Sequence, residues 1–210
     1  MTKVSLDQIE QATREALIAH GAAAPAADAV ADAVREAEGT GNKICGLYYL
    51  QSYCEQLLSG RVNGHAAPDV STPRAGAVRV DAMLGFAQPA FAAGLDAAIA
   101  AARTNGTASL AICHAHTCTS LGYFTGQIAR RGLIGIGFTN ASAIVAPPGG
   151  RTRVLGTNPI AFSVPDGQGG VAMQFDQSTT TVALGKITMA NAAGERIPEG
   201  WAVDENGQPP

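Results

Sequence analysis

Apolar and polar positions in the first 60 residues recur with the spacing of an α-helix. Ser5 and Gln8 form a capping-box pattern ahead of an apolar series, and Gly21 follows that series. A second helix is predicted from Pro25, because proline is tolerated in a first helical turn. A third helix is predicted over residues 47–59. Its expected inward positions are Leu50, Tyr53, Leu57 and Leu58. The pattern therefore predicts an N-terminal helical module.

After residue 60 the pattern changes to short apolar runs that alternate with helical stretches. Pro68, Pro73 and Gly76 interrupt the helical spacing, so we expect a connection there and a domain boundary near residue 70. The predicted elements beyond it are a strand at 77–80, a helix from about Pro89 to Gly106, a strand at 109–113, a helix at 121–131 and a strand at 133–139.

Two further apolar runs, 160–164 and 171–175, flank the turn signal Pro165-Asp166-Gly167 and predict an antiparallel hairpin. The segment 194–210 is rich in turn residues, and no helix is expected in it. We therefore expect an α/β fold in which residues 1–70 are helical and residues 71–210 form a mixed, largely antiparallel sheet flanked by helices.

The charge, the lengths of the apolar runs and the cysteine spacing argue against several classes of protein. The net charge is -3 and basic residues form no run, so we expect no nucleic-acid partner. No stretch approaches the roughly 18 apolar residues of a membrane span, and the first residues lack a leader pattern, so we expect a cytoplasmic protein without membrane contact. The four cysteines have no framework spacing and are expected to be reduced, with Cys54 as a small core residue.

The strongest candidate site in the residue pattern is the segment 114–121, between a buried strand and a helix, where open α/β sheets expose a ligand crevice. The hydroxyls of Thr117, Thr119 and Ser120 either cap the helix or help its N-terminus to bind a phosphate. His116 is the preferred acid/base candidate, because an imidazole exchanges protons near neutral pH.

The same region contains possible metal ligands and a glycine-containing segment. His114 and His116 with Cys113 and Cys118 match no established zinc spacing, so no metal site is expected. The segment GIGFTN lacks the third glycine of a Rossmann fingerprint, and its glycines fall within a predicted strand. A nicotinamide cofactor would therefore need a non-Rossmann fold.

Three long segments resemble the type-2 malate/L-lactate dehydrogenase family. They are GLIGIGFTNASAIVAPPGGRTRVLGTNPIAFSVP, MQFDQSTTTVALGKITMANAAGERIPEGWAVDENGQP and YLQSYCEQLLSGRVN. The resemblance covers essentially the whole chain and corresponds to the N-terminal two-thirds of the family. It implies a homodimeric oxidoreductase that uses NADH or NADPH, with residues 71–210 as an incomplete cofactor-binding domain and residues 1–70 as part of the substrate and dimer domain.

The resemblance also implies positions for cofactor contacts. They lie in the loop after the 109–113 strand, in the Gly-Thr-Asn-Pro turn, in the Asp-Gln-Ser segment and at one lysine. The implied residues are Thr117, Cys118, Thr119, Ser120, Leu121, Thr157, Asn158, Asp176, Gln177, Ser178 and Lys186. Thr157 would also approach the substrate.

Several positions depart from the family's pattern. The Ser-His pair near the third helix is Ile44-Cys45 here, and the arginine expected to grip a substrate carboxylate is Tyr49. The histidine of the central loop is Thr117, although the neighbouring His116 can stand in for it. We therefore take His116, Cys45 and Tyr49 as candidate catalytic residues.

These residues are compatible with two functions. The first is an NAD(P)-dependent oxidoreductase for a 2-oxo or 2-hydroxy acid, or for a cyclic imine or amino acid, with an atypical proton donor. The alternative is a non-catalytic or truncated relative that serves binding or association. The retained Gly-Thr-Asn-Pro turn, Asp176 and Lys186 favour the first.

Overall fold

The N-terminal part of the chain is helical, as the apolar spacing predicts. The computed structural model describes residues 3–208. Its first elements are α1 (Leu6–Ala19), α2 (Ala24–Gly39), the 3-10 turns η1 (Lys43–Cys45) and η2 (Leu47–Tyr49), and α3 (Leu50–Leu58). The predicted capping box is confirmed, since the Ser5 hydroxyl accepts from the Gln8 N–H at 3.1 Å and the Gln8 side chain accepts from the Ser5 N–H at 2.8 Å.

The third helix differs from its prediction at both ends. Residues 47–49 form a 3-10 turn, and the α-helix begins at Leu50. Leu58 was predicted to face inward and is 70% exposed, because it lies in the last turn on the solvent side. Tyr53 and Leu57 are buried as predicted, and Cys54 packs in the same core. All four cysteines are free.

Two three-stranded sheets follow the helices. The first has the order β1-β2-β3 and the second the order β4-β5-β6. Their strands are β1 (Asp69–Arg74), β2 (Ala77–Asp81), β3 (Ser109–Cys113), β4 (Gly135–Phe138), β5 (Ile160–Pro165) and β6 (Val171–Gln177). β2 pairs with β3 in parallel, and the other neighbours are antiparallel. This arrangement confirms the mixed, largely antiparallel α/β class and the β5–β6 hairpin, but it divides the strands between two sheets.

Two helices pack on the sheets where small residues allow a close approach. In α4 (Ala87–Asn105), a side chain at Gly94 would collide with Val80 of β2. In α5 (Gly122–Arg130), Thr125 lies against Gly135 of β4, and its hydroxyl is 2.8 Å from that of Ser163. Both helices were predicted, with starts that differ by one or two residues.

Two elements were not predicted. Residues 69–74 were expected to form a connection, yet they form β1, in which every residue is exposed. No apolar alternation marks such an edge strand, and Pro73 lies within its irregular register, where a missing N–H is tolerated. The helix α6 (Leu184–Ala193) was also missed, because it has no buried residue and therefore no inward-facing stripe.

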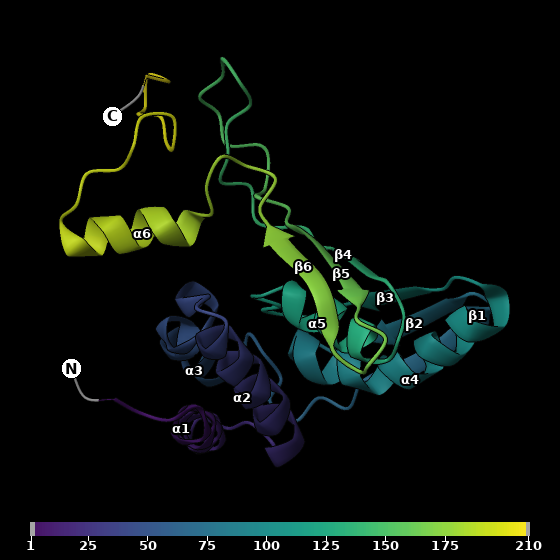
Figure 1. Ribbon diagram of the computed structural model, residues 1–210. Helices are drawn as coiled ribbons and strands as arrows, with labels where there is room; N and C mark the ends of the chain where they lie inside the picture. Colours follow the sequence, from purple (N-terminus) through teal and green to yellow (C-terminus); the bar gives the residue numbers. More distant parts are fainter. Residues whose placement is uncertain (1–2, 209–210) are drawn as a thin grey trace.

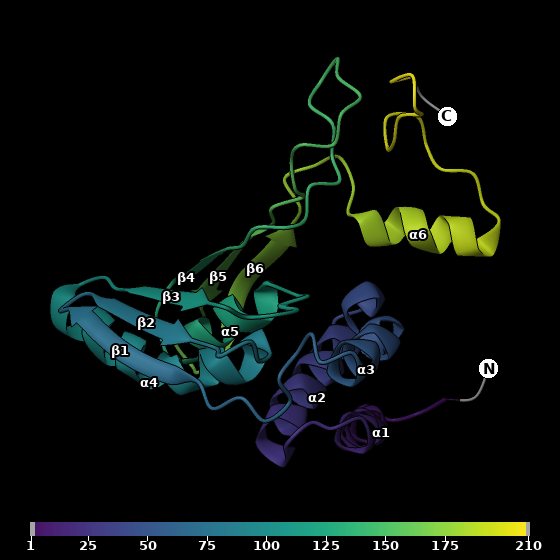
Figure 2. The ribbon, with the colours of Figure 1, turned by 180° about the vertical axis from the view of Figure 1, so that it is seen from behind.

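The helical module lies beside the sheets in both views of the molecule (Figure 1, Figure 2). The Tyr123 hydroxyl donates to Asp32 at 2.9 Å, and Arg130 pairs with Glu36 at 3.1 Å, which ties α5 to α2. The segment 141–158 and α6 project away from this body (Figure 1). The domain boundary near residue 70 stays a prediction. No helix among residues 3–208 combines the length and apolar composition that a bilayer span requires.

Candidate functional site

A cleft with a volume of ≈ 1670 Å³ gathers residues from the helical module, the loop after β3, the end of β4 and the start of α6. The predicted site residues that line it are Cys45, Tyr49, His116, Thr117, Cys118, Thr119, Leu121 and Thr157. Asn158 lines a second cavity of ≈ 540 Å³, and both cavities share Phe138, Thr139 and Asn140. The two cavities therefore adjoin at the end of β4.

The loop after β3 adopts an uncommon backbone conformation. His114, Thr117 and Thr119 have φ values of 50°, 57° and 46°, in the left-handed region that residues other than glycine rarely enter. The Thr117 hydroxyl donates to the Gln56 side chain at 2.7 Å, and the Thr119 hydroxyl lies 3.0 Å from that of Tyr53. Such strain persists only where surrounding contacts fix it, and it is concentrated at functional sites.

A buried glutamine also holds this loop. Gln88 is 1% exposed, and its amide donates to the Thr117 carbonyl at 3.0 Å and to the Tyr53 hydroxyl at 3.4 Å. Its carbonyl oxygen has no hydrogen-bond partner within residues 3–208. Burial raises the pKa of Tyr53, so its phenol stays protonated at neutral pH. Neither Gln88 nor Gln56 carries a local sequence signal, because their partners are distant along the chain.

Main-chain hydrogen bonds fix the position of His116. Its N–H donates to the Gly85 carbonyl at 2.9 Å, and its carbonyl accepts from the Ala87 N–H at 3.0 Å. These bonds attach the loop to the start of α4, and the half-buried His116 side chain lines the cleft. The main chain of His116 is thus anchored beside the cavity.

The thiols of the cleft are uncharged at neutral pH. Burial, with contributions from Asp176 and Cys118, raises the pKa of Cys45 to about 12. Burial also raises the pKa of Cys118, whose Sγ donates to the Thr139 hydroxyl at 3.9 Å. Cys45 can therefore hold a proton or donate a hydrogen bond, but it cannot act as a base at neutral pH.

The N-terminus of α5 is occupied by a carboxylate. Asp176 accepts from the Gly122 N–H at 2.8 Å and from the Ser120 hydroxyl at 3.2 Å. The prediction that Thr117, Thr119 or Ser120 caps this helix is wrong, because their hydroxyls bond to other side chains. A phosphate at this helix end would have to displace the Asp176 carboxylate.

The Gly-Thr-Asn-Pro turn is held close to the segment that follows β6. The Thr157 carbonyl accepts from the Thr179 N–H at 2.9 Å, and the Asn158 side chain accepts from the Ala141 N–H at 2.9 Å. A side chain at Gly156 would collide with the Ala141 carbonyl and with Asn158, so this turn requires glycine. The turn, the Asp176 segment and the start of α5 are therefore joined through hydrogen bonds.

The remaining predicted contacts lie outside the cleft lining. Gln177 is exposed and pairs with Ile160 across the β5–β6 ladder, while the Ser178 hydroxyl donates to the Thr180 carbonyl at 3.2 Å. Lys186 is exposed on α6, whose preceding residue Gly185 closely approaches Ile44. The roles of these three residues, like those of the predicted residues that line the cleft, stay predictions.

Comparison with known proteins identifies relatives over the full length of the chain. The sequence model of the malate/L-lactate dehydrogenase family matches residues 4–210. A Delta(1)-pyrroline-2-carboxylate/Delta(1)-piperideine-2-carboxylate reductase of Pseudomonas putida is 36% identical, over 100% of this chain and 61% of the relative. A (2R)-3-sulfolactate dehydrogenase (NADP(+)) of Chromohalobacter salexigens is 41% identical, over 98% of this chain and 61% of the relative.

Solved structures have the same fold. The delta1-piperideine-2-carboxylate reductase of Pseudomonas syringae superimposes with a TM-score of 0.93 at 36% identity, covering 100% of this chain and 63% of that chain. A malate dehydrogenase of Entamoeba histolytica superimposes with a TM-score of 0.91 at 26% identity, covering 99% of this chain and 58% of that chain. The chain thus spans about three-fifths of the length of these relatives. As its segments suggested, this chain belongs to the malate/L-lactate dehydrogenase family.

Proposed function

We propose that this chain forms part of an NAD(P)-dependent oxidoreductase that acts on a cyclic imine or on a 2-oxo or 2-hydroxy acid. The observation that carries the proposal is the cleft that gathers Cys45, Tyr49 and His116 beside the strained loop and Thr157. The names of the relatives, which include reductases of cyclic imine carboxylates and a sulfolactate dehydrogenase, support the same chemistry.

The residues of the cleft fit a nicotinamide cofactor. The volume of the cleft exceeds the several hundred Å³ of a typical ligand pocket. Thr117, Thr119 and Thr157 offer hydroxyl groups to the amide and ribose groups of the cofactor. The N-terminus of α5 already holds the Asp176 carboxylate, so we do not assign the pyrophosphate to it. A reduced nicotinamide, when bound, supplies a hydride to a C=N or C=O carbon. Either NADH or NADPH fits this description.

We assign proton handling to His116 and substrate positioning to Cys45 and Tyr49. His116 is fixed beside the cleft by its main chain, and its ring can hold a proton for the atom on which negative charge develops. The protonated Cys45 thiol and the Tyr49 hydroxyl can donate hydrogen bonds to a substrate carboxylate. Neither supplies the charge of an arginine, so we expect weak carboxylate binding.

One observation favours the alternative of a binding protein without catalysis. Cys45, with a pKa of about 12, is a poor acid at neutral pH, and the cleft has a tyrosine where the family has a carboxylate-gripping arginine. Cofactor binding without turnover would support this alternative.

The test combines fluorescence titration of NADH and NADPH with turnover assays. The substrates are Delta(1)-pyrroline-2-carboxylate, Delta(1)-piperideine-2-carboxylate and 3-sulfolactate. We expect cofactor binding, turnover of at least one substrate, and a decrease in kcat of about 10²- to 10⁴-fold for His116→Asn. Cys54→Ser, in the helical core, is the matched control and should retain turnover. If neither cofactor binds, the proposal is wrong.

We also propose that the protein is a homodimer located in the cytoplasm. The outer face of the second sheet supports the dimer, because Met173 and Phe175 are large apolar residues exposed there. Cell fractionation tests the location, and light scattering tests the oligomeric state.

A further inference from the structure

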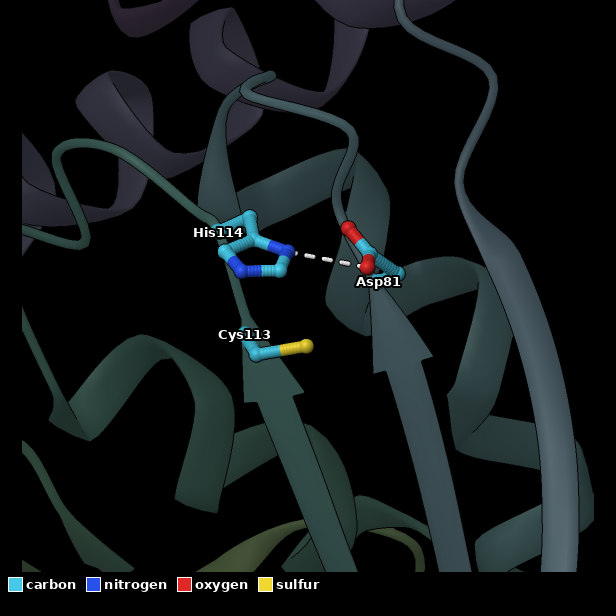
Figure 3. A group of neighbouring side chains, drawn as sticks. All are labelled: Asp81, Cys113 and His114. Carbon is cyan, nitrogen blue, oxygen red and sulfur yellow. Dashed lines mark hydrogen bonds and ion pairs between the residues drawn. The ribbon is translucent and has the colours of Figure 1, made fainter.

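Two neighbouring strands bring an aspartate and a cysteine together outside the predicted catalytic set. Asp81 ends β2, Cys113 ends β3, and the parallel register pairs these two residues directly. Paired residues of adjacent strands direct their side chains to the same face of a sheet. Figure 3 shows the Cys113 sulfur and the Asp81 carboxylate on one side of the two strand ends.

The next residue, His114, completes the group. In an extended strand its side chain would point to the face opposite that of Cys113. Its φ of 50° changes this direction, and the ring Nδ1 lies 2.9 Å from Asp81 Oδ2 (Figure 3). One ligand atom from each of Asp81, Cys113 and His114 lies within 4.8 Å of the other two.

This set of donor atoms suits a first-row divalent cation. Sulfur, imidazole nitrogen and carboxylate oxygen are the three donors that Zn²⁺ takes in proteins. Bond lengths of roughly 2.0–2.3 Å in a tetrahedral site place ligand atoms about 3.3–3.8 Å apart, so small side-chain rotations suffice. Three protein ligands leave a fourth position for water, and the 61% exposed His114 side chain leaves the site open to solvent.

A backbone hydrogen bond orients the Asp81 carboxylate toward the other two residues. Its Oδ1 accepts from the Met83 N–H at 2.9 Å, which leaves Oδ2 directed at the group. A hydrogen bond that orients a ligating carboxylate is typical of protein metal sites.

We propose that Asp81, Cys113 and His114 bind one Zn²⁺ or a similar divalent cation. The cation would replace the thiol proton of Cys113, which is released to solvent, and would share Oδ2 of Asp81. The sequence pattern did not indicate this site, because Asp81 is distant from Cys113 in the chain, and His116 and Cys118 are not members. The proposal does not depend on cofactor binding or turnover.

One basic residue competes with the cation. Arg79 Nη2 lies 3.4 Å from Cys113 Sγ and 3.9 Å from Asp81 Oδ2. Its side chain is 55% exposed, so it is free to move into solvent when a cation binds. Because two positive charges repel at this distance, removal of the guanidinium should strengthen metal binding.

The test is metal titration of the full chain without an affinity tag. Zn²⁺ affinity is measured by competition with a chromophoric chelator, and Co²⁺ is used as a spectroscopic probe of sulfur ligation. We expect one ion per chain and a thiolate-to-cobalt charge-transfer band. Cys113→Ser, His114→Asn and Asp81→Asn should each weaken Zn²⁺ binding by about tenfold or more. Asparagine tolerates the left-handed backbone at position 114.

Two variants distinguish this site from metal binding elsewhere on the chain. Cys54→Ser removes a thiol from the helical core and should leave Zn²⁺ affinity unchanged. Arg79→Gln should strengthen Zn²⁺ binding about two- to fivefold. Absence of the cobalt band in the unaltered chain, no bound Zn²⁺ in excess metal, or unchanged affinity in a folded Cys113→Ser protein would overturn the proposal. The first two readouts need no variant to fold.

Discussion

At the scale of single residues, the environment of Cys45 determines what the cleft can do. Burial of the thiol away from water, with smaller contributions from the nearby Asp176 and Cys118, raises its pKa to about 12. The family resemblance implies a proton-exchanging histidine at this position, and this chain instead has a group that keeps its proton at neutral pH. This difference is the reason for assigning proton handling to His116.

The raised pKa of Cys45 predicts how stability depends on pH. Above the ordinary thiol value of 9.0, the unfolded chain releases this proton while the folded chain retains it. The folded state then binds more protons, so the free energy of unfolding falls with rising pH, by up to about 1.4 kcal/mol per pH unit. Cys45→Ala should make this fall shallower between pH 9 and 11 in urea denaturation experiments.

The control for this experiment is Ser52→Ala, which alters the same cleft without removing a thiol. If the free energy of unfolding falls equally steeply with pH in Cys45→Ala and in the unaltered chain, the assigned environment of Cys45 is contradicted.

A second residue-scale prediction concerns Gln88. Gln88→Leu keeps the volume close to that of glutamine but removes the hydrogen bonds to Thr117 and Tyr53. We expect a decrease of about 1 kcal/mol in the free energy of unfolding, measured by urea denaturation. The exposed Gln51 provides the matched change, Gln51→Leu, which should have little effect. If Gln88→Leu is no less stable than Gln51→Leu, Gln88 does not hold the loop.

At the scale of elements, the start of α5 illustrates how tertiary contacts override local signals. Three hydroxyl residues precede this helix and would ordinarily cap it, but its first N–H group, that of Gly122, donates to a carboxylate from β6. The cap comes from Asp176, which is distant in the sequence, so no local pattern predicts it.

Removal of the Asp176 charge should destabilise α5. Asp176→Asn keeps an acceptor oxygen but loses the interaction of a negative charge with the positive end of the helix, at a cost of about 1 kcal/mol. The measurement is urea denaturation at low salt, with Asp69→Asn on the exposed β1 as the matched control. Equal stability of the two variants would contradict the capping role. Tighter NADPH binding by Asp176→Asn would instead favour a phosphate at this helix end.

Most of the elements that sequence predicted have an apolar face that packs against another element, and β6 is an exception because its alternating Met173 and Phe175 are exposed. α1 to α5 and the buried strands have such faces. β1 and α6 have none and were missed. The residue pattern alone predicted the cleft only where consecutive residues form it, at 114–121, whereas Cys45, Tyr49 and Thr157 were indicated by the family resemblance. Asp81, Gln56 and Gln88 reach the same region through tertiary packing, which sequence spacing does not encode.

At the scale of the whole molecule, the second sheet has one covered and one open face. Ser163 and the glycines of β4 face α5, whereas Phe175 and Phe162 stack on the other side with ring centroids 6.0 Å apart. An exposed apolar sheet face of this kind is typical of an interface. This is the basis for expecting two copies of the chain to associate.

Dimerisation is tested by light scattering across a range of protein concentrations. We expect a mass of twice the 21.3 kDa chain and a shift toward monomer for Met173→Ser and Phe175→Ser, because both remove exposed apolar surface. Leu58→Ser removes a more exposed apolar residue from α3 and should leave the mass unchanged. A monomer at every concentration, or a dimer unaffected by all three changes, would contradict this interface.

The central claim is that the strained loop, the Gly-Thr-Asn-Pro turn and the Asp176 segment together hold a nicotinamide cofactor. Hydrogen–deuterium exchange with and without saturating NADH or NADPH tests it most directly. The expected result is slower exchange of backbone amides in 114–121, 156–158 and 176–178 when the cofactor is bound. Cofactor binding that leaves these three segments unprotected and slows exchange only elsewhere would contradict the claim.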